Sequence, residues 1–162
     1  SDVAAPLASV VTYKFAATGG KPAVDLIWYD GGLRPSLPDE YEIDRKVADN
    51  GIFFEGDKGV IFSDLWSPRI VPEAKMKEYK LPPKTLPRVK DHYENWLEAC
   101  KAGGKAVSDF DYAGPLTETV LLGNLAIRAG KKIYWDSENM KVTNCQEANR
   151  FVQRQYRQGW SL

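Results

Sequence analysis

SDFDYAGPLTETVLLGNLAIRAGKKIYWD, residues 108–136, decides the fold, because it joins a loop, a helix and a strand in one uninterrupted stretch. Gly114 is an acceptable N-cap, and Pro115 fits the first helical position, where its missing N–H costs nothing. Gly130 is typical of a left-handed C-cap. Apolar side chains between these limits cover most of the helical circumference, so we expect a helix that is buried on most sides.

One glycine lies within the apolar arc of this expected helix. Gly123, flanked at helical spacing by Val120 and Ile127, costs about 1 kcal/mol of helix stability relative to alanine. A close approach by a sheet backbone is the expected reason, because a missing β-carbon lets another chain come near. We therefore expect the helix to pack on a sheet at Gly123.

Composition places the chain among ordinary globular domains. Of 162 residues, 43% are hydrophobic and 12% aromatic, which is enough for a sizeable core. The 22 basic and 22 acidic residues cancel and form no run of like charge, so we expect no nucleic acid and no membrane as a partner. Cys100 and Cys145 lack metal-ligand spacing, so we expect neither a disulfide framework nor a metal site.

The N-terminus, SDVAAPLASV, lacks the basic and apolar regions of a signal peptide, and no apolar run in the chain reaches membrane length. The chain also begins without methionine. We therefore expect this chain to be one part of a longer protein.

Two β-hairpins are predicted in the first part of the chain. In residues 10–15 and 24–29 the side chains alternate at the period of a strand, with turn residues between the two runs. Residues 51–65 form the clearer hairpin, with a glycine on each side of its tip. Between the hairpins, residues 30–50 have no periodicity, so we interpret them as a long loop or lid with a binding role.

Helices dominate the second half. Residues 73–79 have room for a short helix, and residues 88–102 repeat apolar side chains on one face, which predicts an amphipathic helix. Residues 132–135 are expected as a strand after the central helix. Asn144 and Glu147 have the spacing of a capping box, which predicts a last helix.

The order of these elements predicts the fold class. Strands first and helices later are typical of an α+β fold, a two-layer α/β sandwich in which an open, mainly antiparallel or mixed sheet carries helices on one face. We expect residues 1–162 to form a single domain. The other face of the sheet then needs a cover, either another subunit or another domain.

The strongest candidate site surrounds a glycine turn. Trp28, Tyr29, Asp30 and Arg34 combine an indole, a phenol, a carboxylate and a guanidinium. This mixture suits a sugar or polyol, because aromatic faces stack on apolar sugar edges while charged groups bind hydroxyls. The alternative stays open that Trp28 is a core residue and that Asp30 only caps the turn.

Other chemistry-bearing residues have simpler explanations. His92 is the only histidine, and a structural role is favoured over acid–base catalysis. Asp109 and Asp111 favour capping over a paired-carboxylate site, and Cys145 favours an inert buried thiol. A helical stripe of arginines suits solvated surface, with anion binding as the alternative: Arg150, Arg154 and Arg157. The dinucleotide fingerprint, the P-loop, and the zinc-protease and serine-hydrolase motifs are all absent from the sequence.

Ordered motifs along nearly the whole chain carry a family resemblance. They are WYDGGLRP (28–35), DNGIFFEGDKGVIF (49–62), SPRIVPEAKM (67–76) and the run from DHYENWLEACKAGG to the end (91–162). In this order they resemble the C-terminal part of bacterial oxidoreductases of the glucose–fructose oxidoreductase, inositol dehydrogenase and MocA family.

The resemblance implies a division of labour. In that family an N-terminal Rossmann domain binds NAD or NADP, and a C-terminal α/β domain with an open sheet contacts the substrate and oligomerises through the sheet face. The residues that bind the cofactor and catalyse hydride transfer are expected upstream of Ser1, so no catalytic or cofactor-binding role passes to His92 or to any other residue of this chain. The resemblance also implies a bacterial cytoplasmic or periplasmic protein.

We therefore expect a substrate-side and assembly domain of an NAD(P)-dependent sugar or polyol oxidoreductase, which cannot transfer hydride by itself. Its expected partners are its own N-terminal Rossmann domain, a second copy and a sugar-like small molecule. Two alternatives stay open. One is a stand-alone carbohydrate-binding or protein-interaction module, and the other is a relative that uses NAD transiently for glycoside hydrolysis or lyase chemistry.

Overall fold

The computed structural model describes residues 4–64, 66–153 and 156–160. It divides into two compact units, one formed by Ser1–Leu33 with Arg88–Leu162 and the other by Arg34–Pro87. Within the described residues, helices are combined with three open sheets in which every strand pair is antiparallel, so the α+β fold class is confirmed. None of the helices in the described part combines the length and the apolar character needed to cross a membrane.

The first unit begins with the predicted hairpin. Strand β1 (Val10–Phe15) pairs with β2 (Val24–Tyr29) so that Tyr13 lies opposite Leu26. Because alternate residues share a face, one side of the hairpin is apolar: Val11, Tyr13, Phe15, Val24, Leu26 and Trp28. An ion pair of 2.6 Å between Lys14 and Asp25 lies on the other side.

Helix α3 (Phe110–Ala129) starts earlier than the sequence predicts. Asp109, and not Gly114, is its N-cap, and its carboxylate accepts a hydrogen bond of 3.1 Å from the backbone N–H of Tyr112. Pro115 consequently lies inside the helix, where it removes one backbone hydrogen bond. The expectation at Gly130 is correct, because this residue caps the helix at φ +65° and donates to the carbonyls of Ala126 and Ile127.

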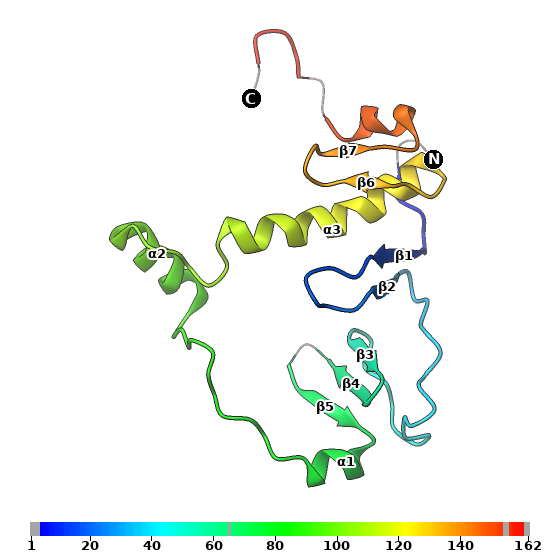
Figure 1. Cartoon of the computed structure of the whole chain (residues 1–162), viewed down its shortest axis with the longest axis vertical. Coiled ribbons are helices and arrows are strands. Elements are labelled where there is room, and N and C mark those ends of the chain that lie inside the picture. Colours follow the sequence, from blue (N-terminus) through cyan, green and yellow to red (C-terminus); the bar gives the residue numbers. More distant parts are fainter. Residues whose placement is uncertain (1–3, 65, 154–155, 161–162) are drawn as a thin grey trace. The chain divides into compact units, whose positions relative to one another are not determined.

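The expected packing at Gly123 exists, but a side chain makes it. A β-carbon at Gly123 would overlap the hydroxyl of Tyr13 and would touch Val11, so the apolar face of the hairpin meets α3 at this glycine. Figure 1 shows β1 and β2 beside α3 within this unit. The helix is nevertheless not buried on most sides, since only Gly123 and Leu125 are buried.

A small core lies on another side of α3. It contains Leu125, Val142, Cys145 and Ala148, contributed by α3, by β7 (Lys141–Val142) and by the 3₁₀ helix η1 (Gln146–Phe151) with the residue before it. Strand β6 (Trp135–Asp136) pairs with β7 and corresponds to the end of the predicted strand at 132–135.

The capping box predicted for the last helix is wrong. Cys145 is the N-cap of η1 and makes no side-chain capping bond. The amide of Asn144 instead accepts from the backbone N–H of Tyr134 at 2.7 Å and donates to the carbonyl of Lys132 at 2.9 Å. Asn144 therefore holds β7 to the segment before β6, which is why it is unavailable to η1.

Helix α2 (His92–Ala102) is an amphipathic helix whose apolar face stays exposed to solvent among the described residues. It is capped by Asp91, whose carboxylate accepts from the backbone N–H groups of Tyr93 and Glu94, and so it begins four residues later than predicted. None of its residues is buried, and Trp96 is 58% exposed.

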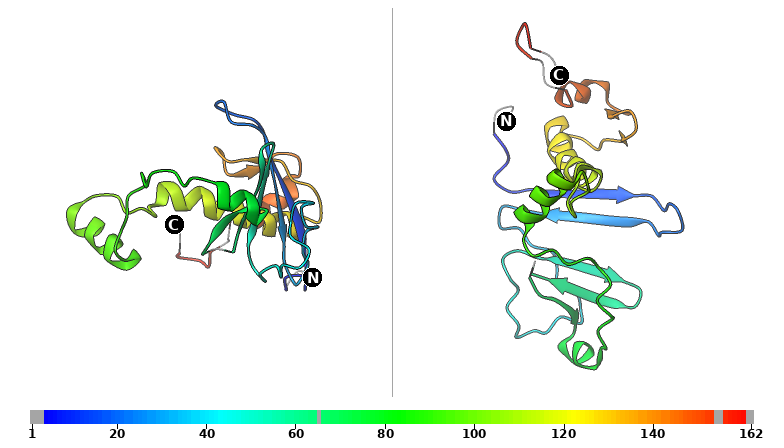
Figure 2. Two further views of the ribbon diagram at one scale, coloured as in Figure 1. Left: turned by 90° about the horizontal axis from the view of Figure 1, so that it is seen from below. Right: turned by 90° about the vertical axis from the view of Figure 1, so that its left-hand side faces the viewer.

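The second unit is a three-stranded sheet with one helix. Strands β3 (Ile52–Gly56) and β4 (Gly59–Ser63) form the predicted hairpin, and β5 (Pro68–Val71), which the sequence did not indicate, pairs with β4. The predicted short helix is α1 (Glu73–Glu78), which follows β5 (Figure 2). The buried core of this unit consists of Tyr41, Val60, Phe62 and Val71.

Candidate functional site

The glycine turn predicted as a sugar site follows β2. Trp28 and Tyr29 are successive strand residues, so their side chains lie on opposite faces of the hairpin. Trp28 is 49% exposed and shares its face with Val11, its cross-strand partner. Tyr29 is half-buried. The two rings therefore cannot sandwich one ligand, and Trp28 is the ring with the more accessible surface.

The carboxylate of Asp30 binds Ser9. One carboxylate oxygen accepts from the backbone N–H of Ser9 at 2.7 Å, and the other accepts from its hydroxyl at 2.9 Å. The backbone N–H of Asp30 in turn donates to the carbonyl of Ser9 at 3.1 Å. Asp30 thus fixes the segment before β1 against the end of β2, and among the described residues its side-chain hydrogen bonds go to Ser9 and not to the turn that follows it.

The turn after Asp30 requires its glycine. Gly31 has φ +64°, and a β-carbon there would overlap the carbonyl oxygen of Leu7 and the backbone of Ala8. The chain before β1 therefore crosses directly over Gly31. This crossing fixes the backbone immediately after Trp28 and Tyr29.

Arg34 belongs to the second unit, where it closes the base of the long loop. Its guanidinium forms an ion pair of 2.7 Å with Asp49 and donates to the carbonyl of Val47 at 3.5 Å. Within the described residues, no hydrogen bond or ion pair joins any two of the four predicted site residues. A binding role for Trp28, Tyr29, Asp30 and Arg34 stays a prediction.

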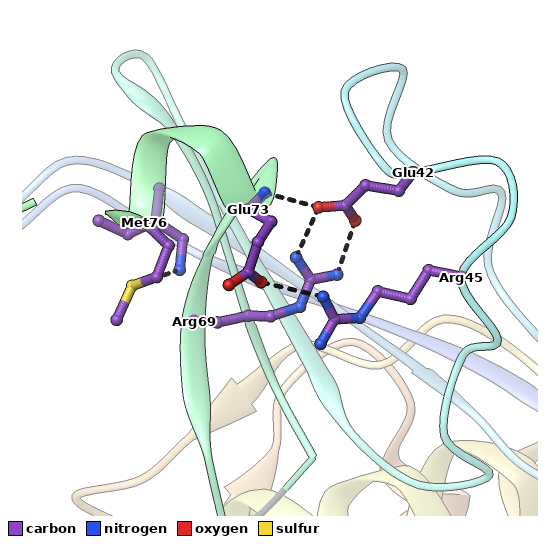
Figure 3. A network of polar contacts seen from close by, with 6 residues as sticks. Glu42, Arg45, Arg69, Glu73 and Met76 are labelled. Carbon is purple, nitrogen blue, oxygen red and sulfur yellow. Dashed lines mark hydrogen bonds and ion pairs between the residues drawn. The ribbon is translucent and has the colours of Figure 1, made fainter. Parts of the chain in front are cut away.

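The same loop carries a charged network that sequence reasoning missed (Figure 3). Arg69 on β5 makes a bidentate pair with the carboxylate of Glu42, with bonds of 3.0 and 2.9 Å. That carboxylate also accepts the backbone N–H of Glu73, the first residue of α1, and the side chain of Glu73 pairs with Arg45 at 2.9 Å. The network fastens residues 42–45 to β5 and α1.

The environment of this network shifts the pKa of Glu42. Hydrogen bonds from Arg69 lower the pKa of Glu42 to about 2, and burial acts in the opposite direction. Arg69 is itself mostly covered, lying 5.1 Å from the ring centre of Tyr41. Because the paired groups all belong to this unit and bind one another, the network suits a structural clamp and not a substrate site.

The remaining candidates also have structural explanations. His92 is exposed at the start of α2, and its ring lies 5.8 Å from that of Tyr93. Asp109 caps α3, and Lys105 pairs with both Asp109 and Asp111. Cys145 is buried in the core beside α3, as the inert-thiol explanation predicts. In the described ranges, no three side chains of the histidine, cysteine, aspartate and glutamate types are grouped as a metal site.

Exposed apolar side chains gather where the hairpin meets α3 in the first unit. On the hairpin, Phe15, Leu26 and Trp28 are between 37% and 49% exposed on the face that meets α3. At about 100° per residue, Leu116 and Val120 lie on the same side of α3 as Gly123, and they are 55% and 47% exposed. We call these five residues the apolar platform.

A comparison with protein families gives the class to which this chain belongs. Residues 29–162 match the sequence model of an oxidoreductase family's C-terminal α/β domain. The chain belongs to the Gfo/Idh/MocA oxidoreductase family and represents its C-terminal domain. Among curated proteins, no significant match was found.

The described residues do not fit a nicotinamide dinucleotide. Such cofactors bind at a glycine-rich turn between a parallel strand and a helix. Every strand pair in the described part is antiparallel, and the sequence lacks the glycine fingerprint. No step of hydride transfer is therefore assigned to these residues.

Proposed function

We propose that this chain is the substrate-side and assembly domain of an NAD(P)-dependent sugar or polyol oxidoreductase. In this proposal an N-terminal Rossmann domain holds NAD or NADP, and the present domain contributes a wall of the substrate pocket and a contact surface. Membership of the oxidoreductase family, together with the poor fit of these residues to a dinucleotide, supports this division.

The apolar platform supports the assembly role. Its five residues, on a hairpin face and on the helix that meets this face at Gly123, are between 37% and 55% exposed. Contiguous apolar surface is typical of protein interfaces. We propose that a second copy, or the cofactor domain of the same protein, covers the platform.

The substrate role rests on Trp28 and the turn that follows it. An indole held at half exposure on a rigid strand end suits stacking against the apolar face of a sugar ring. Asp30 and Gly31 fix the backbone there through Ser9 and Leu7. We therefore assign Trp28 the direct contact and Asp30 the positioning of that contact.

Fluorescence titrations of the purified chain test the proposal. With NADH and with NADPH we expect no saturable quenching of the chain alone. A longer protein that includes the residues encoded before Ser1 should show saturable quenching and should oxidise a sugar or polyol. Saturable cofactor binding by the chain alone would overturn the proposal. Tight sugar binding by the chain alone, with no Rossmann domain encoded upstream, would favour a stand-alone carbohydrate-binding module instead.

A further inference from the structure

Two arginines of the first unit lie against one aromatic ring. The guanidinium carbon of Arg128, in the last turn of α3, is 4.1 Å from the ring centre of Phe151, and that of Arg150 is 4.7 Å from the same centre. Phe151 packs against the core formed by α3, β7 and η1. The ring, which packs against this core, therefore supports both guanidinium groups.

These two arginines differ from those of the second unit in their partners. Arg34, Arg45 and Arg69 each pair with a carboxylate at 2.7 to 2.9 Å. Among the residues that the structure describes, neither Arg128 nor Arg150 has a carboxylate within ion-pair distance, although Glu147 is close to Arg150 in sequence. Both side chains are exposed, so their charges are available to a ligand.

The surroundings add positive charge. Lys131 and Lys132 follow the C-cap of α3, and the ammonium of Lys132 lies 4.7 Å from the ring centre of Tyr134. The carboxylate of Asp136 accepts from the backbone and the side chain of Asn139. In the described part of the chain, no carboxylate forms an ion pair with Arg128, Arg150, Lys131 or Lys132.

Contact with Phe151 orients the arginines for binding. Through their shared ring the two guanidinium carbons are closer to one another than a Debye length, about 10 Å at 0.1 M salt, so they repel. Cation–π contact and the helix C-terminus offset part of this repulsion. A guanidinium supported by a ring keeps N–H donors free, and these donors match phosphate oxygens in pairs.

We propose that Arg128 and Arg150 form a binding site for a phosphate monoester dianion. Two fixed positive charges match the two negative charges of the ligand, and the paired oxygens of phosphate match the guanidinium donors. The site is separate from the turn at Trp28 and does not depend on the proposed oxidoreductase function.

Nuclear magnetic resonance tests this site on the unmodified chain. The probes are inorganic phosphate, glucose 6-phosphate and AMP, which separate free phosphate from a sugar phosphate and a nucleotide, with sodium chloride added to hold ionic strength constant. We expect saturable shifts of the Arg128 and Arg150 side-chain N–H signals with at least one probe. Shifts that are absent, or that grow linearly without saturating for all three probes, would overturn the proposal.

Variants supply the second measurement. In calorimetric titrations with the tightest probe, R128Q and R150Q should each weaken binding at least fivefold, whereas R88Q, which removes the same charge from an exposed arginine before α2, should change it less than twofold. Equal weakening in all three variants would show a general charge effect and would contradict a site at Phe151. The signals of the unmodified chain decide the question if a variant does not fold.

Discussion

The hydroxyl of Tyr13 occupies the space that a side chain at Gly123 would need. This contact joins the β1–β2 hairpin to α3. Burial raises the pKa of the Tyr13 hydroxyl, and a hydrogen bond with the backbone of Gly123 acts in the opposite direction. A residue without a side chain is therefore needed in the middle of the helix, because the Tyr13 hydroxyl lies against this position.

Replacing Gly123 by alanine should destabilise the chain by about 1–2 kcal/mol, because Tyr13 must move away from the new β-carbon. In a Y13F background the same alanine should be neutral or stabilising, since the nearest remaining atom, the ring Cζ, is at an ordinary contact distance of 3.4 Å. Urea denaturation of the four variants measures this coupling.

Gly114 provides the control within the same helix. No atom lies within 4 Å of a β-carbon built there, so G114A should gain about 1 kcal/mol from helix propensity alone. If G123A stabilises the chain as much as G114A does, with Tyr13 present, the contact between Tyr13 and Gly123 has no energetic role.

Asn149 should be among the most sensitive polar residues of the first unit. Its amide accepts from the N–H of Val142 at 2.7 Å and donates to the carbonyl of Val142 at 3.0 Å. Since Val142 is 1% exposed, N149A leaves its buried N–H and carbonyl without hydrogen-bond partners. The free energy of unfolding should fall by about 2–4 kcal/mol. Thermal or urea denaturation measures the loss, and exposed Asn124 on α3 is the control, with N124A expected within about 0.5 kcal/mol.

The Glu42–Arg69 pair should make the free energy of unfolding depend on pH in the acid range. The pKa of Glu42 in the folded chain, about 2, lies below its ordinary value of 4.5. The stabilisation that the ionised Glu42 gives the folded chain is therefore fully present above pH 4.5 and is lost as the pH falls through 2. E42Q should therefore cost about 2 kcal/mol near pH 7 and progressively less toward pH 2. Urea denaturation across this range gives the measurement.

Glu40 offers the matched comparison in the same loop. Its pair with Lys75 is 4.0 Å long and exposed, so E40Q should change stability by less than about 1 kcal/mol at every pH. A pH profile of E42Q that runs parallel to that of the unmodified chain would show that the bidentate pair does not cause the acid sensitivity.

Trp28 should matter for substrate more than for stability. In the longer protein, W28A should lower kcat/KM for the sugar or polyol by about tenfold, because about 1–1.5 kcal/mol of stacking is lost. W66A removes an indole that is 89% exposed in the second unit and should leave kcat/KM unchanged. Equal effects of the two substitutions would remove Trp28 from the substrate pocket.

The sequence predicted the elements better than their ends. The hairpin in residues 10–29 was predicted correctly because apolar and polar side chains alternate in both of its strands within one short segment. The start of α3 was misplaced because Pro115 is tolerated inside the helix once Asp109 caps it. Asn144 matched a capping pattern, yet its amide is used by a segment ten or more residues away, which no local pattern contains.

Long-range contacts also limited what could be predicted of the site. The sequence identified Trp28 and Asp30 as neighbours of a glycine turn, but not that Ser9 would take both oxygens of Asp30. The Glu42–Arg69 clamp joins residues 27 positions apart, one in a loop that has no periodicity and the other on β5. Its only sequence signal was the density of charge in residues 30–50.

Hydroxyl-radical footprinting of the apolar platform tests directly whether it meets another protein surface. Phe15 and Leu116 should be oxidised readily in the isolated chain and should be protected at least fivefold in the longer protein, while exposed Trp66 is oxidised equally in both. Oxidation of Phe15 and Leu116 at the same rate in both proteins would contradict an assembly role for this surface.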